Sequence, residues 1–462
     1  MARGLFRSLQ VVVVVVPLCC IGVTGATQRG KEAQRYRYAN RPDDLFPYAR
    51  VRIYRDFYAL PMQFPGAGRK APEPPLEIVR LGFIGPLLAQ DGPILPEGFR
   101  PVVSNPSKAL FGRHQLWGAM LAVEKANRSG GYRGKKFQLV RRTDLVQWGQ
   151  TSNELAQFAY QDEVWGIESS IDSNHCHVLN RAALKAEIPI VNAGSSDPTL
   201  TEHTIPWLVR CINDDRLNSY ELLSYLFGVK GYTRLALLRV NDRDGRLGVE
   251  ELIKGAIRLK HPLLAELRFE NGDTDFQEQL ERIRQLSAQA VVLWANPPEG
   301  AGIVRQMREM GMSQQVVGFD RLAHPLFLEL AGVAAEGTVV ASAYNPDRDD
   351  RLWRSFQKHY LERFGEVPDS YAAHGFDGMS LLLWAVRQGG LNRVRIRDAL
   401  YSLRSFPGVA GRIVFDRTMN DIGRPWLARV EKGRFHYFRP PDWPRRQELR
   451  VVIESRPGAS ED

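Results

Sequence analysis

The sequence predicts an α/β protein with parallel sheets, and two observations support this prediction. Short apolar segments alternate with amphipathic segments along most of the chain, and this alternation stops and restarts once. The chain has 462 residues, which is too long for one ordinary core. We therefore expect two successive α/β units, each with helices packed on its own sheet.

Turn residues separate the expected elements of the first unit. Gly85-Pro86 ends the first apolar segment, and Gly130-Gly131 ends the first amphipathic helix. The expected strands are 77–84, 137–140, 164–167 and 188–191, and the expected helices are 111–127, 152–160 and 177–186. Because a helix follows each of the first three strands, the strands should be parallel.

The same alternation returns in the second unit. The expected strands are 234–240, 266–269, 290–294 and 316–319, and the expected helices are 219–227, 248–259, 275–286, 300–310 and 326–331. After an apolar segment at 337–341, the pattern predicts helices at 349–364, 371–388 and 393–403 and strands at 411–415 and 425–430. The chain therefore adds a helical stretch and two final strands to the two units.

Residues 1–26 have the layout of a secretory signal peptide. Arg3 and Arg7 precede an apolar segment centred on Val11–Val16, and small residues ending at Ala26 provide a cleavage site. The apolar segment is too short for a comfortable membrane span. We therefore expect an exported, soluble mature protein.

Two further segments lie outside the α/β units. Residues 27–76 form an arm rich in Arg, Tyr and Pro, and residues 439–462 form a Pro-rich charged tail that we expect to be partly disordered. The arm has ten Lys and Arg against five Asp and Glu, so it supplies half of the formal net charge of +10. Because no concentrated basic face is evident in the body, the charge does not indicate nucleic-acid binding. We expect the arm to be a solvated or wrapped extension, with docking on a membrane surface or a partner as the alternative.

One loop organises the prediction of function. The apolar segment Ile188–Val191 runs directly into the small polar residues Asn192–Ser196. In an open α/β sheet, ligands bind at the carboxyl ends of the strands, and small residues there let backbone N–H groups approach an anion. The alternative is an ordinary turn in which Ser195 and Ser196 only cap the backbone.

Several stretches occur in an order and spacing typical of one family. They are Leu81–Leu87, Gly118–Asn127, Pro189–Thr201, Ile303–Gly311, Gly375–Asp377 and Gly411–Asp416. Through these stretches the chain resembles the type I periplasmic solute-binding proteins of ABC transporters, in their leucine/isoleucine/valine-binding branch, over about residues 77–438. The arm and the tail lie outside the resemblance.

The resemblance implies two doubly wound α/β lobes joined by a three-crossing hinge. Lobe 1 is expected at 77–208 with 341–408, and lobe 2 at 209–340 with 409–438. The implied function is capture of a small solute between the lobes, which close on it, and delivery to an ABC transporter permease in the periplasm. The resemblance implies no catalysis and no cofactor, and we expect a monomer. The alternative is a ligand-sensing module for a separate signalling partner.

The resemblance also implies the ligand-binding residues. The family's first contact loop corresponds to Ser170–Asn174, and Phe111 falls where the family often has a tyrosine. The implied ligand-binding residues are Phe111, Ser170, Asp172, Ser173, Ser195, Ser196, Asn296 and Asp320. The chain departs from the family at Asp244-Gly245, where Tyr-Gly is usual, and in a long insert at 91–108. A branched-chain ligand therefore does not follow from the resemblance.

Asp320 carries the most specific hypothesis. The apolar segment Val316–Phe319 ends at Asp320, and a carboxylate at the end of a strand faces the cleft in this architecture. Neutral serine donors on the opposite lobe suit a ligand carboxylate, whereas an ammonium group needs an acceptor. We therefore expect Asp320 to bind the ammonium group of an amino acid or a close relative. The alternatives are that Asp320 pairs with Arg321 or caps the next helix, or that Asp172 accepts the ammonium group.

Cys176 and Cys211 are the two cysteines outside the signal peptide. Export to an oxidising compartment makes them a candidate disulfide. Two buried free thiols are the alternative.

An enzyme is the competing class of protein. His175 and His177 flank Cys176, but at positions i and i+2 they would not share a helix face, and the sequence has no third ligand at a suitable spacing. The stretch Gly245–Gly248 lacks the Gly-Lys-Ser/Thr pattern of a phosphate-binding loop. We therefore expect neither a metal site nor a catalytic set of residues.

Overall fold

The computed structural model describes residues 67–95, 99, 106–145, 148–202 and 205–443. All of these residues belong to one unit of the chain, which spans Tyr38–Asp462. The predicted signal peptide, most of the predicted arm and the tail from residue 444 onward lie outside the described residues. None of the helices in the described ranges combines the length and the apolar composition that crossing a bilayer requires.

The first lobe is built on a five-stranded parallel sheet with the strand order β2-β1-β3-β4-β5. Its strands are β1 (Ile78–Gly85), β2 (Lys136–Thr143), β3 (Ile167–Ser169), β4 (Ile190–Asn192) and β5 (Leu208–Arg210). Its helices are α3 (Pro106–Arg128), α4 (Thr151–Tyr160), α5 (Ser173–Ala186), α6 (Thr199–Glu202), α14 (Ser370–Gly389) and α15 (Arg393–Ser402).

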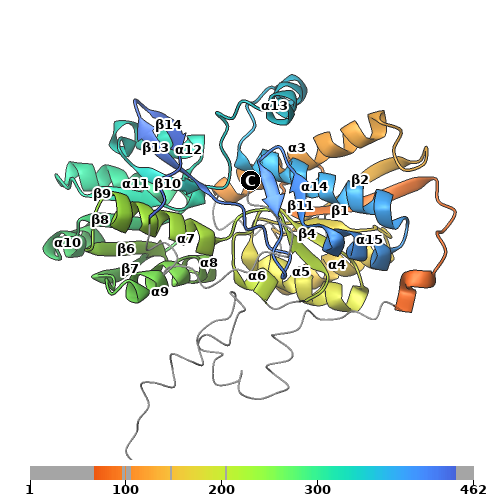
Figure 1. Cartoon of the computed structure of the whole chain (residues 1–462), viewed down its shortest axis with the longest axis horizontal. Coiled ribbons are helices and arrows are strands. Elements are labelled where there is room, and N and C mark those ends of the chain that lie inside the picture. Colours follow the sequence, from red (N-terminus) through yellow and green to blue (C-terminus); the bar gives the residue numbers. More distant parts are fainter. Residues whose placement is uncertain (1–66, 96–98, 100–105, 146–147, 203–204, 444–462) are drawn as a thin grey trace, which may run out of the picture. The chain divides into compact units, whose positions relative to one another are not determined.

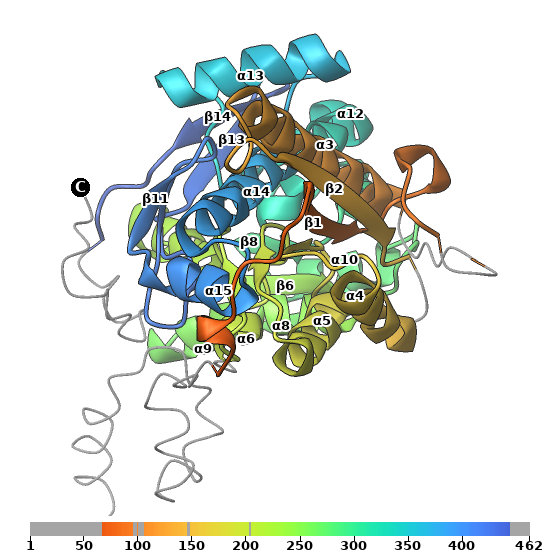
Figure 2. The same ribbon diagram turned by 90° about the vertical axis from the view of Figure 1, so that its right-hand side faces the viewer.

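Helices cover both faces of the first sheet. Leu81 and Phe83 of β1 belong to one buried cluster with residues of α3 and α14, which lie side by side in Figure 2. Ile84 of the same strand belongs to a second cluster with residues of α4 and α5. Because successive residues of a strand point to opposite faces, this division is the expected result of a doubly wound sheet.

The second lobe is built on a seven-stranded sheet with the order β14-β13-β10-β9-β8-β6-β7. Its parallel strands are β6 (Leu235–Val240), β7 (Ala265–Phe269), β8 (Ala290–Trp294), β9 (Gln315–Gly318) and β10 (Val339–Ser342), and its antiparallel strands are β13 (Trp426–Glu431) and β14 (Arg434–Phe438). Its helices are α7 (Asp215–Leu223), which continues as a π-helix at Ser224–Val229, α8 (Arg243–Gly248), α9 (Glu250–Arg258), α10 (Gln277–Gln285), α11 (Pro297–Glu309) and α12 (Pro325–Ala331).

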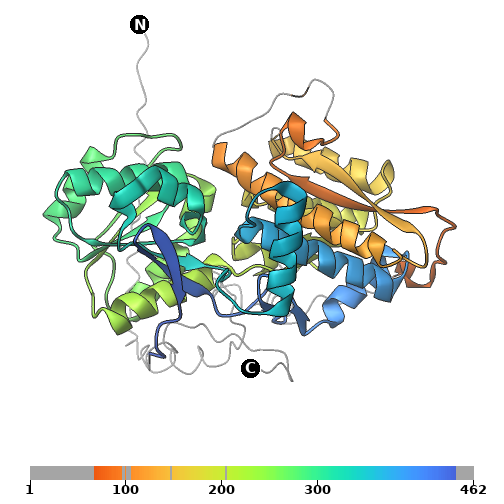
Figure 3. The same cartoon turned by 90° about the horizontal axis from the view of Figure 1, so that it is seen from above.

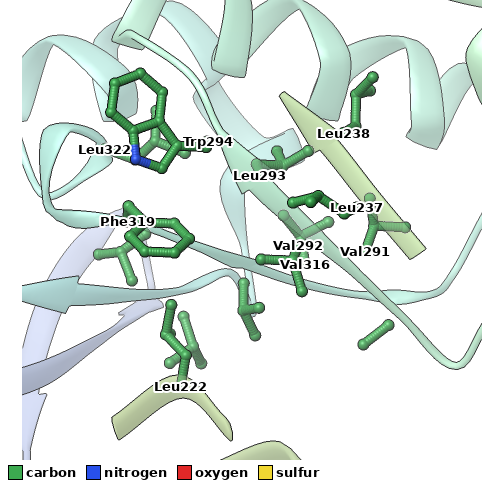
Figure 4. Close-up of a cluster of buried hydrophobic side chains, with 14 of the residues drawn as sticks. Leu222, Leu237, Leu238, Val291, Val292, Leu293, Trp294, Val316, Phe319 and Leu322 are labelled. Atoms are coloured by element: carbon green, nitrogen blue, oxygen red, sulfur yellow. The ribbon is translucent and has the colours of Figure 1, made fainter. Parts of the chain in front are cut away.

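Aliphatic residues of the central strands form the core of the second lobe. Figure 4 shows Leu237, Val292, Leu293 and Val316 packed close together, and all four are fully or almost fully buried. Every residue of β6 and β8 is buried, as expected for central strands covered on both faces. This burial explains why the unbroken apolar run 290–294 predicted a strand.

The chain passes between the two sheets three times. The crossings lie between β5 and β6, between β10 and α13 (Arg351–Phe364), and between β12 (Arg412–Val414) and β13. In Figure 1 the late, blue part of the chain is accordingly divided, with α14 and α15 beside β1 and with β13 and β14 beside β10. Asn213 Nδ2 of the first crossing donates to Gly423 O of the third at 2.6 Å, so these two crossings are hydrogen-bonded to each other.

The helix α13 packs on the outside of the first lobe. Figures 2 and 3 show it running across α3. The rings of Trp117 on α3 and Phe364 on α13 stack with centroids 4.8 Å apart. The last residues of the arm also contact this lobe, because Glu73 accepts the hydroxyl of Tyr132 at 3.0 Å and Arg69 Nη2 donates to Asp398 at 3.1 Å.

Some predicted elements were wrong in extent. The third strand covers 167–169 rather than 164–167, and β5 and β11 (Ser405–Pro407) were not predicted. The helix α5 begins at Ser173 rather than at residue 177, because the Asp172 side chain accepts the N–H groups of Asn174 and His175 and caps an earlier first turn.

Candidate functional site

Except for Phe111, which belongs to α3, the predicted ligand-binding residues lie at the carboxyl ends of strands in both lobes. The loops after β3 and β4 of the first lobe carry Ser170, Asp172, Ser173, Ser195 and Ser196, and the loops after β8 and β9 of the second lobe carry Asn296 and Asp320. Two hydrogen bonds connect the first-lobe loops to α8 and α7 of the second lobe: Ser173 Oγ donates to the Asp244 carboxylate, and Ser196 Oγ donates to Asp215 Oδ2 at 3.0 Å. The structure therefore brings the predicted loops of the first lobe against the second lobe.

Asp215 and Asp320 are two acidic residues at the contact between the lobes, and the charge of Asp320 acts on Asp215. Burial raises the pKa of Asp215 well above its ordinary value, and the negative charge of Asp320 raises it further. Burial also raises the pKa of Asp320, although the neighbouring Arg321 opposes this effect. Oδ1 of Asp215 is buried and has no hydrogen-bond partner among the described residues. An unsatisfied buried acceptor beside a second carboxylate favours a positively charged partner.

A network of four charged side chains joins the lobes beside this pair. Lys108 Nζ of the first lobe lies 2.7 Å from Asp172 Oδ2 and 3.8 Å from Asp244 Oδ2 of the second lobe. Arg321 Nη2 lies 3.3 Å from the same Asp244 oxygen, and Arg321 Nη1 donates to Asn296 Oδ1 at 3.0 Å. Burial alone would lower the pKa of Lys108, but Asp172 and Asp244 outweigh it and raise this pKa. Lys108 therefore carries a positive charge between the lobes.

Aromatic side chains line the contact between the lobes. Phe111 of α3 stacks on Tyr371 of α14 with ring centroids 4.4 Å apart and an interplanar angle of 13°. The ring of His324, from the second lobe, lies 4.9 Å from that of Phe111. Burial raises the pKa of Tyr371, and the charge of Asp320 raises it further, so the phenol stays protonated beside this carboxylate. The predicted aromatic position Phe111 thus belongs to a wall that spans both lobes.

Three buried side chains, His114, Asp369 and His324, form what we call the histidine clasp. Asp369 Oδ2 lies 2.8 Å from His114 Nδ1 and 3.1 Å from His324 Nε2. His114 and Asp369 belong to the first lobe, at α3 and at the N-terminus of α14, whereas His324 precedes α12 of the second lobe. Nε2 of His114 also lies 3.2 Å from Glu366 Oε2. One carboxylate oxygen therefore holds a ring from each lobe.

The histidine clasp also contains the donor atoms of a candidate metal site, since its ligand atoms all lie within 4.8 Å of one another. However, Nδ1 of His324 accepts the backbone N–H of Leu326 at 3.1 Å. The proton of a neutral His324 ring therefore resides on Nε2, the atom that faces Asp369, and a protonated nitrogen cannot ligate a metal. The arrangement favours a proton-linked contact between the lobes over a metal site.

Several predicted contact residues already have partners within the protein. Asp172 caps α5 and pairs with Lys108, which makes it a structural residue as well as a candidate ligand contact. The Ser170 hydroxyl accepts the N–H of Asp172 at 3.1 Å. By contrast, the buried Ser195 hydroxyl forms no hydrogen bond within the described ranges, although its N–H donates to Asn192 Oδ1 at 3.2 Å. The Ser195 hydroxyl therefore differs from that of Ser170 in having no partner within the described part of the protein.

The candidate disulfide between Cys176 and Cys211 is not formed. Both thiols are free and buried. Each sulfur has a polar partner instead, because Cys176 Sγ lies 3.1 Å from Ser170 O and Cys211 Sγ lies 3.4 Å from Asn192 O. The alternative of two buried free thiols is the one that the structure shows.

Six residues of the site were not identified from the sequence: Lys108, His114, Asp215, His324, Asp369 and Tyr371. Lys108 ends the long insert, which offered no pattern by which to single it out. Asp215 closes the polar stretch 213–215 between the two α/β units, and this position at a crossing was the only available signal. His324 was missed because its role depends on Asp369, which lies 45 residues away in the sequence.

Comparison with known proteins agrees with this architecture. A family model described as "Periplasmic binding protein" matches residues 103–434. The chain is 24% identical over 345 residues to "Leu/Ile/Val-binding protein homolog 2" of Brucella abortus (strain 2308), covering 72% of this chain and 90% of the relative. LivJ from Streptococcus pneumoniae, a branched-chain amino acid transporter substrate binding protein in complex with isoleucine, superposes with a TM-score of 0.68 at 22% identity, covering 79% of this chain and 100% of that one. A solute-binding protein of an ABC transporter from R. palustris, in complex with benzoate, superposes with a TM-score of 0.67 at 16% identity, covering 78% and 96%.

Proposed function

Because the chain belongs to the periplasmic binding protein family, we propose that it is an exported receptor that captures an amino acid or a close relative between its lobes and delivers it to an ABC transporter permease. The family consists of solute-binding proteins without catalytic activity. The relatives include proteins named for branched-chain amino acids and a structure with benzoate, so the family alone does not choose the ligand.

The pair of Asp215 and Asp320 carries the choice of an amino acid. Both carboxylates have raised pKa values, and Asp215 Oδ1 is an unsatisfied buried acceptor. An ammonium group placed against this pair would satisfy the acceptor and would relieve the repulsion between the two charges. A ligand that carries only a carboxylate would supply no hydrogen-bond donor for this acceptor.

The opposite end of the ligand would meet neutral donors of the first lobe. Ser195 follows β4, and its hydroxyl is not engaged within the described residues. Neutral hydroxyl and N–H donors suit a carboxylate without requiring a cation. A zwitterion would therefore contact both lobes at once, which favours the closed arrangement because only that arrangement makes both contacts.

We further propose the lobe boundaries 77–208 with 341–408 and 209–340 with 409–438. The membership of β5 in the first sheet and of β6 in the second supports the first boundary. The crossings after β10 and after β12 place the other two boundaries a few residues later in the chain, after 342 and after 414. We also propose that the protein is a monomer and is located in the periplasm.

A thermal-shift screen tests the proposed ligand class. A ligand present at 100 times its Kd stabilises the folded state by about 2.7 kcal/mol, which is easily detected as a rise in Tm. The panel should contain amino acids, their amides, their des-amino carboxylic acids and benzoate. We expect stabilisation only by compounds that carry an amine. Stabilisation by benzoate or by a des-amino acid, with no amino acid active, would overturn the proposal.

A further inference from the structure

A groove lies where the chain passes between the two sheets, and we call it the hinge groove. Its volume is about 460 Å³. All three crossings line it: Cys211 and Asn213 belong to the first, Arg348 to the second, and Asp421 and Arg424 to the third. A molecule bound in the hinge groove would therefore contact every connection between the lobes.

Four arginines line the hinge groove: Arg348, Arg412, Arg424 and Arg439. Two of them have acidic partners, because Arg424 Nε lies 3.0 Å from Glu221 and Arg348 Nη2 lies 3.3 Å from Asp350. Among the described residues, Arg412 and Arg439 have only neutral acceptors. Arg412 Nη2 donates to Ser405 Oγ at 3.2 Å, and Arg439 Nη2 donates to the backbone oxygen of Arg424 at 3.2 Å.

The acidic residues of the hinge groove do not balance these arginines. Asp421 is buried, and its Oδ1 accepts the N–H groups of Val414 at 3.0 Å and Gly423 at 2.9 Å. Burial raises the pKa of Asp421 to about 6, so this carboxylate is protonated more readily than an ordinary aspartate. Asp442, the other carboxylate of the groove, lies 3.2 Å from Arg424 Nη1. Arg412 and Arg439 therefore remain as uncompensated positive charges.

Two further observations favour binding of an anion in the groove. Burial lowers the pKa of Arg439, and the charge of Arg424 lowers it further, which means that these two guanidinium groups repel each other. Nε of Arg348 is buried and has no hydrogen-bond partner among the described residues. An anion in the groove would reduce the repulsion and could accept from this donor.

We propose that the hinge groove is a second binding site, distinct from the amino-acid site, for a small polyvalent anion of the phosphate or polycarboxylate class. Guanidinium groups bind carboxylate and phosphate oxygens in pairs of parallel hydrogen bonds, and two uncommitted guanidinium groups suit a ligand with at least two negative charges. The volume fits a molecule of a few carbon atoms.

The position of the site at the hinge gives it a consequence for solute binding. Because the three crossings change conformation when the lobes open or close, an anion that fits one arrangement better shifts the equilibrium towards that arrangement. The coupling is reciprocal, so a solute bound between the lobes changes the affinity for the anion by the same factor. Occupancy of the hinge groove therefore regulates solute capture.

Calorimetry with citrate and with inorganic phosphate, as two separate arms at low ionic strength, tests this proposal on the full-length mature protein. The test variant is Arg412→Gln combined with Arg439→Gln, two exposed positions whose replacement leaves the buried core unchanged. The matched control is Arg354→Gln, an exposed arginine that pairs with Asp349 and does not line the groove. Both proteins lose positive charge, but only the first loses it in the groove.

We expect at least one of the two anions to bind the unmodified protein and the Arg354→Gln control with similar affinity. In the double variant the Kd should rise by at least tenfold, since a hydrogen bond to a charged group contributes about 1.5–3 kcal/mol. Binding by citrate alone identifies the polycarboxylate class, and binding by phosphate alone identifies the phosphate class. The proposal is wrong if neither anion binds at millimolar concentration. It is equally wrong if the double variant and the control bind as well as the unmodified protein, because the binding would then be a general effect of charge.

Discussion

Replacing Asp369 with Asn should release the histidine clasp and remove the pH dependence that the clasp gives to folding. The substitution removes the oxygen that His114 and His324 share, and the amide nitrogen that takes its place cannot accept from either ring. Asn is as good an N-cap residue as Asp, so the cap of α14, in which Oδ1 accepts the N–H of Ala372 at 2.7 Å, is retained. The variant therefore isolates the contact between the lobes.

The direction of the pH effect follows from two pKa shifts. Burial would lower the pKa of His114, but Asp369 and Glu366 outweigh it and raise this pKa, so the contribution of His114 is complete below about pH 6.5 and is lost as the pH rises through the raised value. Burial would raise the pKa of Asp369, but His114 and His324 hold it well below its ordinary value. The contribution of Asp369 is therefore present above about pH 4 and is lost as the pH falls. The clasp stabilises the fold fully between about pH 4 and pH 6.5.

The expected magnitude is large because the pair is buried. His114 and Asp369 are 6% and 5% exposed. Removing one partner of a buried ion pair costs about 3–5 kcal/mol, so Asp369→Asn should lower the free energy of unfolding by about that amount at pH 5.5 and by less at pH 8. Urea denaturation at both pH values measures this difference.

A matched substitution serves as the control. Asp350→Asn alters another N-cap, at α13, where the carboxylate accepts the N–H of Trp353 at 2.8 Å and has no histidine partner among the described residues. It should lower stability by the same small amount at both pH values. A loss of less than about 1 kcal/mol for Asp369→Asn at pH 5.5, or pH profiles that run parallel in the variant and the unmodified protein, would refute the reasoning.

Three further predictions concern the site and its surroundings. Lys108→Met should lower the free energy of unfolding by about 3 kcal/mol, because Asp172 and Asp244 would then repel each other across the lobes. An unchanged midpoint in urea denaturation would contradict this expectation. Thiol titration of the unfolded, unreduced mature protein should detect two free thiols, since Cys176 and Cys211 are free, whereas detection of none would show that they pair in the exported protein. Phe111→Ala should weaken solute binding and should lower the free energy of unfolding by about 3–5 kcal/mol, because Phe111 would no longer stack on Tyr371. A free energy of unfolding within about 1 kcal/mol of that of the unmodified protein, measured by denaturant titration, would show that Phe111 is not tightly packed.

The elements that could be predicted from the sequence are those whose burial leaves a simple pattern. The strand β8 was predicted at its observed bounds because five consecutive apolar residues are buried on both faces. The strand β5 was missed because it has only three residues, one of which is Arg210. This arginine is fully buried, and its charge is satisfied by Asp214 at 3.1 Å and Asn420 at 2.7 Å. Such a network cannot be inferred from a local pattern.

The candidate site likewise contains residues that a local sequence pattern indicates and residues that only the fold brings together. Asp320 could be proposed from the sequence because it directly follows an apolar strand, which is a local signal. The second carboxylate, Asp215, precedes the first strand of its lobe, whereas Asp320 follows β9. Only the folded chain brings the charge of Asp320 close enough to raise the pKa of Asp215. For Asp172 the local signal was ambiguous. An aspartate before a helix is expected both as an N-cap and as a ligand contact, and the sequence alone does not separate the two roles.

Calorimetry of one amino acid and its des-amino analogue, on the unmodified protein and on Asp320→Asn, tests the proposed function most directly. The amino acid is the member of the panel that stabilises the protein most. A hydrogen bond to a charged group contributes about 1.5–3 kcal/mol, so the substitution should weaken binding of the amino acid by about tenfold to a hundredfold. The des-amino analogue should bind both proteins equally poorly, because it lacks the group that Asp320 recognises. Tight binding of the des-amino analogue, unaffected by Asp320→Asn, would contradict the assignment of an ammonium-bearing ligand to this site.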